Sequence, residues 1–131
     1  MSESKEGLLA WSLKARGARM SEKEGLILFS YPKVKFYDGG KLASEITAEA
    51  GEMKTLTRDA VLTGGVKVNS KRDGMNLSSS RLYFSSARGK VWTDDEVTIN
   101  RGKTVIRGRG FTANPDLSEI EIKRQETRLD K

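Results

Sequence analysis

Apolar and polar residues alternate along almost the whole chain, and this alternation constrains the fold more than any other feature. It is clearest at residues 34–36, 66–68 and 97–99, where Val-x-Phe, Val-x-Val and Val-x-Ile stand between polar neighbours. Neighbouring side chains of a β-strand point to opposite faces, so a period of two predicts strands with one apolar face. Even residues 44–53, rich in Ala and Glu, are read as a strand because their apolar positions alternate. The sequence therefore predicts an all-β chain.

Turn signals separate the alternating runs. They stand at residues 38–40, 72–74, 100–102 and 114–116, and the first three end in glycine. Glycine after Asp or Gly favours hairpins, because such turns need a positive φ. The three valine triplets begin 32 and then 31 residues apart. This spacing fits hairpin units stacked along one axis, and it equally fits an ordinary meander.

No predicted helix is available to cover the apolar face, so the sheet must fold on itself. The 131 residues suffice for one domain, and the result would be a sandwich, a jelly roll or a half-open barrel. Its apolar lining is either filled by side chains or left as a trough for a ligand.

Composition excludes several kinds of chemistry. The chain has no Cys and no His, which removes a thiol nucleophile, a Ser-His-Asp triad and a histidine zinc site. The acidic triplet 94–96 is interpreted as a solvated turn before a strand, because consecutive strand residues face opposite ways. We expect no catalytic residues, no metal, no cofactor and no enzymatic activity. The net charge of +6 favours anionic partners.

The stretch TVIRGRGFTANPD, residues 104–116, admits a nucleic-acid reading and a strand reading. As a strand it places Gly108 and Gly110 on the face of Ile106 and turns the two arginines outward, with a bulge after Gly110. A dinucleotide loop is excluded because a third glycine and a following helix are lacking. The aromatic residues are interpreted as core and rim of the sheet rather than as base-stacking platforms; they are Trp11, Tyr31, Tyr37, Tyr83 and Trp92. A basic β-barrel that binds nucleic acid remains the alternative from another class.

Three short motifs in this order carry a family resemblance. They are L-x-G-x-V-x-V from Leu62, T-D-x-x-V-x-I from Thr93 and I-x-G-x-G-F from Ile106. Over residues 8–125 the chain resembles the LptC family, the membrane-anchored bridge component of lipopolysaccharide export. The same fold is shared within an LptA, LptC and OstA-like superfamily, so a soluble LptA-like bridge protein is the nearest alternative.

The resemblance implies a half-open, taco-shaped β-jelly roll that encloses an apolar groove. The groove would hold the acyl chains of lipopolysaccharide while the sugars stay in water. The expected lining combines this fold with strand parity: Leu28, Val34, Phe36, Ile46, Val66, Val68, Leu77, Leu82, Phe84, Val97, Ile99, Ile106, Phe111, Ile120 and Ile122.

The resemblance also implies partners and a location. The domain would receive lipid from an inner-membrane ABC transporter and pass it to a periplasmic LptA-like bridge protein, at the periplasmic face of the inner membrane. Docking edge to edge, or pairing with a second copy, would involve Trp11, Leu13, Gly108, Gly110, Ile120 and Ile122.

The domain is expected at residues 8–128, between a flexible segment 1–7 and a tail 129–131. Family members carry an N-terminal membrane helix, and the longest apolar run here, GLILF, is too short for one. That helix was either removed from this chain, or the chain is a soluble relative.

Overall fold

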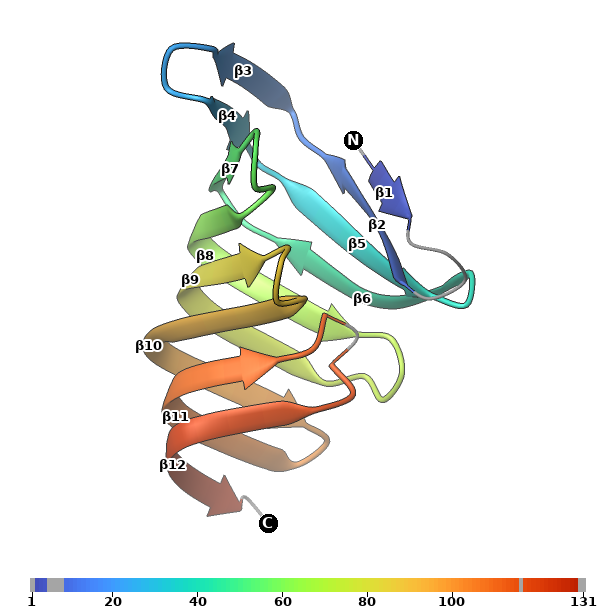
Figure 1. Cartoon of the computed structure of the whole chain (residues 1–131). Helices are drawn as coiled ribbons and strands as arrows, with labels where there is room; N and C mark the ends of the chain where they lie inside the picture. The colour runs from blue at the N-terminus through green and yellow to red at the C-terminus, as the bar shows by residue number, and fades with distance from the viewer. Residues whose placement is uncertain (1, 5–8, 116, 130–131) are drawn as a thin grey trace.

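The computed structural model describes residues 2–4, 9–115 and 117–129, and these form twelve strands in one antiparallel sheet without a helix (Figure 1). The strands are β1 (Ser2–Ser4), β2 (Leu9–Lys14), β3 (Gly17–Ser21), β4 (Leu26–Ser30), β5 (Lys33–Asp38), β6 (Lys41–Thr47), β7 (Ala50–Lys54), β8 (Ala60–Ser70), β9 (Asn76–Ser85), β10 (Lys90–Arg101), β11 (Thr104–Ala113) and β12 (Ile120–Leu129). The all-β prediction is confirmed, and residues 44–53 are extended as predicted, with a break after Thr47.

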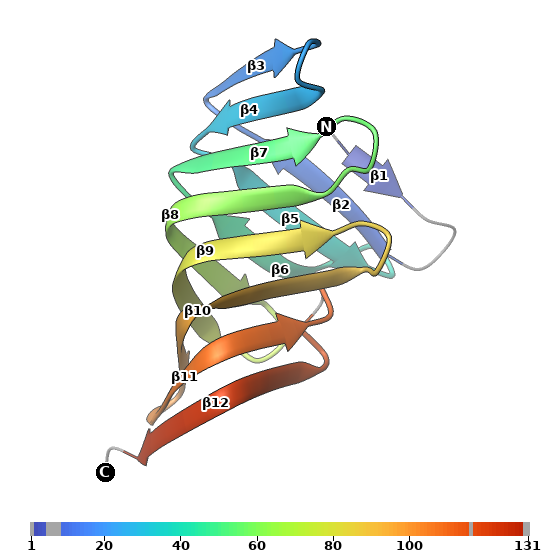
Figure 2. The same ribbon diagram turned by 60° about the vertical axis from the view of Figure 1, so that its left-hand side comes forward.

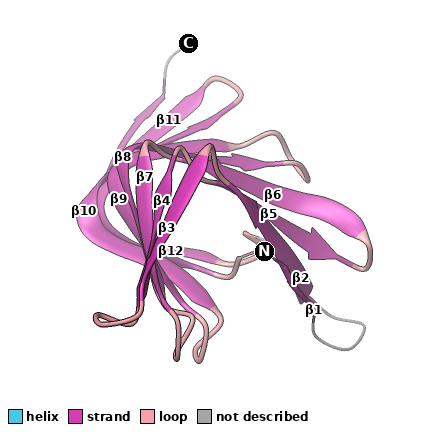
Figure 3. Ribbon diagram, turned by 90° about the horizontal axis from the view of Figure 1, so that it is seen from above, coloured by secondary structure: helices cyan, strands magenta, loops and turns pink. Residues whose placement is uncertain are grey.

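The sheet divides in two at β8. The first residues of β8 pair with β7, and the last pair with β6. Strands β7, β4 and β3 therefore continue in one layer, and β6, β5, β2 and β1 continue in another (Figure 2). We call these the β3 layer and the β2 layer. Strands β8 to β12 run through both, so the view from above shows a sheet folded over on itself (Figure 3).

Backbone irregularities mark the line along which the sheet folds, which we call the crease. Gly64 and Gly65 have φ of +82° and +54° inside β8, and the register to β9 shifts by one residue there. A side chain at Gly64 would place its Cβ 2.7 Å from Oε2 of Glu49, whose N–H donates to the Gly64 carbonyl at 2.9 Å. Only glycine fits both this φ and this contact. The L-x-G-x-V-x-V motif thus encodes the bend.

The acidic triplet also lies at the crease, which corrects its interpretation as a turn. Asp94, Asp95 and Glu96 are inside β10, where the register to β9 and to β11 shifts. Their partners come from three other strands: Ser80 donates to Asp95 at 3.1 Å, Arg109 pairs with Glu96 at 3.1 Å, and Lys123 pairs with Asp94 at 3.5 Å. These carboxylates accordingly help to link β10 to β9, β11 and β12.

Two further expectations differ from the structure. Ser2–Ser4 was expected in a flexible segment but forms β1, which pairs with β2. The bulge expected after Gly110 lies instead in β10, opposite that glycine. Gly110 itself has a φ of +85°, and Gly110 and Phe111 are consecutively buried. The change of phase within 104–113 is therefore real, but the extra residue belongs to β10.

Candidate functional site

The inner face of the β2 layer carries a row of apolar residues that pair directly from strand to strand. Starting on β2 and ending on β11, the row is Leu13, Val34, Ile46, Val68, Leu77, Ile99 and Ile106. In an antiparallel sheet directly opposed side chains touch, so such a row makes a continuous apolar track across the strands. The valine triplets at 34, 66 and 97 contribute to this layer.

The β3 layer carries a matching row. From β3 to β12 it is Met20, Ile27, Met53, Ala60, Phe84, Val91, Ala113 and Ile120. The first member lies on edge strand β3, where the Met20 side chain is 61 % exposed. The last lies on edge strand β12, which pairs only with β11. The apolar track therefore reaches both edges of the sheet.

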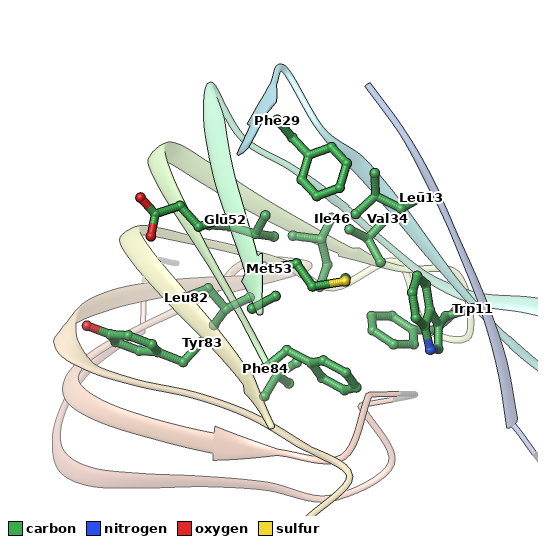
Figure 4. Close-up of a pocket in the computed structure, with 14 residues that line it drawn as sticks. Trp11, Leu13, Phe29, Val34, Ile46, Glu52, Met53, Leu82, Tyr83 and Phe84 are labelled. Carbon is green, nitrogen blue, oxygen red and sulfur yellow. The ribbon is translucent and has the colours of Figure 1, made fainter. Parts of the chain in front are cut away.

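Toward β2 and β4 the two layers are closed against each other; we call this the closed half. Aromatic side chains that include Trp11, Phe29 and Phe84 point into the space (Figure 4). The rings of Phe36 and Phe84 approach to 5.7 Å between centroids. The remaining cavity is about 30 Å³ and is lined by residues that include Trp11, Phe29 and Leu82. Binding pockets for small molecules usually measure about 300–1,000 Å³. An acyl chain would enter this half only if the layers moved apart.

Toward β11 and β12 the track opens into a hollow of about 500 Å³, which we call the open half. Its lining is mixed, with Ile99, Ile106, Ile120 and Ile122 beside the polar Arg101, Thr104 and Ser118. The three isoleucines at 106, 120 and 122 are only half-buried. This half has the volume of a ligand site without rearrangement, and isoleucines form part of its wall.

A hydrogen bond joins the two layers at their lips, the edges that lie opposite the crease. The Ser44 hydroxyl on β6 donates to the Pro115 carbonyl at 2.7 Å, and both residues are buried. Leu117, two residues further along, packs against the core. The connection between β11 and β12 thus bridges the two layers on the open side of the folded sheet, which we call the mouth.

The rim of the open half holds a paired acid. Asp73 lies in the β8–β9 turn, and the Arg101 guanidinium pairs with its carboxylate. Partial burial alone would raise the pKa of Asp73, but hydrogen bonds from the Met75 N–H, Ser70 and Arg101 outweigh it and hold the pKa below its usual value. No three acidic side chains in the described part of the chain gather closely enough to hold a metal ion.

The sequence matches the family described as LptC: Lipopolysaccharide-assembly, LptC-related, over residues 2–130. The chain belongs to the LptC-related family. Among solved structures it is similar to LptH from Pseudomonas aeruginosa, described as the LptA homologous periplasmic component of the lipopolysaccharide transport device. That likeness has a TM-score of 0.69 at 11 % identity and covers 92 % of this chain and 95 % of LptH, so it supports the fold. A comparison with curated protein sequences finds no match.

The LptC-like fold confirms the predicted half-open jelly roll, and most of the predicted lining lies inside it. Fourteen of the fifteen residues belong to the core or pack against it. Leu28 is the exception, because Ile27 and Phe29 take the buried positions of β4 and Leu28 turns to the outer face. Whether the fourteen contact lipid stays a prediction.

Several lining residues were not predicted to contact lipid. Trp11 and Leu13 were expected to serve docking, and both line the closed half. Ile27, Phe29, Met53, Leu62, Met75 and Val91 are also buried in the core. Some of them could have been found from the alternation of side chains, because Met75 lies two residues before Leu77 and so shares its face.

The residues predicted to dock a partner occupy different places in the sheet. Ile120 and Ile122 lie on edge strand β12, but Trp11 and Leu13 on β2 and both glycines on β11 lie in strands paired on both sides. A Cβ at Gly108 would stand 2.4 Å from Cγ2 of Ile122 and 2.7 Å from the Arg124 carbonyl oxygen. The close approach that Gly108 permits is therefore to β12 of the same chain. The described residues include no helix long and apolar enough to cross a membrane.

Proposed function

We propose that this chain is a non-enzymatic relay module of lipopolysaccharide export. It holds acyl chains between its two layers, leaves the sugars in water, and works at the periplasmic face of the inner membrane. Lipid comes from the inner-membrane ABC transporter and passes to the next periplasmic bridge protein. Membership of the LptC-related family supports the transport role. The apolar space between the two layers, closed and open halves together, is called the trough, and it supports an acyl chain as the cargo.

The observation that carries the proposal is the pair of in-register apolar rows. Both rows continue beyond the buried core, to an exposed methionine on one edge and half-buried isoleucines on the other. A path along which an apolar chain slides needs both ends open. The rows supply this path, because each step from strand to strand offers another apolar side chain.

Free sheet edges at both ends supply the docking surfaces. Among the strands that the structure describes, β3 and β1 on the upstream side and β12 on the downstream side each pair with a single neighbour. An exposed edge is an aggregation hazard unless it pairs with a partner strand. Docking of another jelly roll by strand addition would join its apolar rows to these. The same edges would serve pairing with a second copy.

Photo-crosslinking from single positions tests the trough. Photoreactive residues at Phe84 or Ile99, which face inward, should capture lipopolysaccharide, and those at Lys35 or Lys67 on the outer face should not. The lysines lie on β5 and β8 of the same sheet, so they control for general adhesion of lipid. Equal labelling of both faces would overturn the proposal.

The likeness to LptH favours a second candidate in the same pathway, a soluble LptA-like bridge. The two roles differ in the upstream partner. Purified transporter should retain an LptC-like module by its β3 side in a pull-down, whereas an LptA-like bridge should bind the transporter only through an added LptC-like protein.

A further inference from the structure

A second hollow, of about 460 Å³, lies on the outer face of the β3 layer near the ends of its strands. It is lined by Tyr83 and Trp92 together with Glu52, Lys54, Asp59 and Arg88. Glu52 and Tyr83 point away from the trough, on the side opposite Phe84 (Figure 4). In contrast to the trough, this hollow combines aromatic rings with charges of both signs, and its volume lies within the range of ligand pockets.

The two aromatic rings form its wall. Tyr83 on β9 and Trp92 on β10 are directly paired, and their rings stack 4.4 Å apart at 16°. Both residues are half-buried and line the hollow. Aromatic faces carry negative potential, which suits the polarised C–H bonds of a sugar ring. The exposed Lys54, Glu52 and Arg88 side chains supply donors and acceptors for hydroxyl and phosphate groups.

The outer hollow meets the trough at the lip of the layer. Glu52, Ala60, Tyr83 and Phe84 line both spaces. Ala60 and Phe84 belong to the apolar row of the β3 layer. A molecule whose apolar part lay along that row would therefore bring its polar part out over this lip.

We propose that the outer hollow binds the phosphorylated sugar part of the transported lipid, with Trp92 and Tyr83 stacking on a sugar ring. This inference rests on the proposed function, because it assigns a place to the headgroup of the lipid whose acyl chains occupy the trough. It adds a polar site that holds the headgroup on the β3 layer while the chains move between layers.

The two tryptophans of the chain test it directly, because Trp11 lines the trough and Trp92 lines the outer hollow. Their indole N–H signals in a nitrogen-15 correlation spectrum are assigned by the loss of one signal in Trp92→Thr. The probe is the water-soluble sugar part of lipopolysaccharide, released by alkaline removal of its acyl chains. It should shift the Trp92 signal and leave the Trp11 signal in place. Intact lipopolysaccharide in detergent micelles should shift both, with empty micelles as reference.

Affinity for the soluble sugar is then compared among variants. Trp92→Thr should weaken it about tenfold, the loss of one good contact. Tyr37→Thr is the matched control, because Tyr37 is a half-buried tyrosine on β5 of the other layer and does not line the hollow. Thermal unfolding of both variants shows that each remains folded.

The outcomes separate the two proposals. A Trp11 shift with intact lipid but no Trp92 shift with the sugar would overturn the headgroup site and leave the relay function standing. An equal response to inorganic phosphate alone would also overturn it, since stacking would then play no part. A Trp92 shift with the sugar and no Trp11 shift with intact lipid would support the sugar site and contradict the acyl trough.

Discussion

The closed and open halves of the trough are built from the same alternation but differ in what fills them. In the closed half, rings from Trp11, Phe29, Phe36 and Phe84 leave a cavity of about 30 Å³. In the open half, isoleucines and polar side chains line a space of about 500 Å³. Side-chain size therefore helps to decide whether an apolar face becomes a core or a groove. Without lipid, the closed half is packed like a core and the open half is accessible to a ligand.

Truncating one side chain in each half should give the largest difference in stability between the halves. Leu82→Ala, in the closed half, should lower the free energy of unfolding by about 2–5 kcal/mol, because it opens a cavity among packed side chains. Ile106→Ala, in the open half, should cost about 1–2 kcal/mol but weaken lipid binding more. Urea unfolding and lipid titration measure the two effects. Equal losses of stability would contradict the distinction between the halves.

Attachment of the open half depends on Gly108. Gly108→Val should lower the free energy of unfolding by about 3 kcal/mol, since its Cβ would collide with Ile122 and with the backbone of Arg124. Hydrogen exchange should show loss of protection in β12 while β5 and β6 stay protected. Arg107→Val is the matched control, because the neighbouring side chain on the same strand is exposed. If both variants behaved alike, the close approach of β12 would not matter.

The contact between the lips should have an intermediate effect. Ser44→Ala removes the hydrogen bond to Pro115 and leaves a buried carbonyl unpaired, at a cost of about 1–2 kcal/mol. The variant should also take up lipid faster, because the connection between β11 and β12 loses its hydrogen bond to β6. Ser78→Ala, at an exposed position of β9, serves as the control. Unchanged stability together with unchanged uptake would show that the contact does not restrain the mouth.

The smallest effect belongs to the rim of the open half. The pKa of Asp73 is lower in the folded state, so its carboxylate stabilises the fold above its unfolded pKa of about 3.9, and this contribution disappears as the pH falls through the folded value. Asp73→Asn should therefore cost less than about 1 kcal/mol at pH 7, and the difference from the parent should vanish in acid. Unfolding curves at several pH values measure it. A difference independent of pH would contradict the assignment.

Strand parity predicted the lining wherever a strand alternates cleanly. Strand parity failed at Leu28 because residues 26–29 are all apolar. Such a run does not show which alternate side chains face inward, and packing of the layers selects Ile27 and Phe29. It gave no sign that the closed half is filled, since volume depends on how side chains from distant strands meet.

Sheet edges were harder to predict than faces. Which strand lies at an edge depends on pairing between segments far apart in the chain. Two residues predicted to dock a partner, Trp11 and Leu13, lie on β2, which pairs with Ser2–Ser4 over residues 10–12, while β3 lies in the other layer. Their part in docking stays a prediction. The glycines of β11 were correctly linked to a close approach, but the approaching strand is β12. Alternation alone allowed a sandwich, a jelly roll or a half-open barrel. The resemblance to the LptC family selected the jelly roll.

The central claim is that acyl chains travel between the layers, so the closed half must open when lipid binds. The chain has no cysteine, so spin labels can be attached at two introduced cysteines alone. Labels at Lys35 and Glu52 report the distance between the layers in the closed half, and labels at Thr98 and Thr112 report it in the open half. On adding lipopolysaccharide, the first distance should lengthen by roughly 4 Å, one layer of carbon contacts, while the second changes little. Bound lipid with both distances unchanged would contradict the claim.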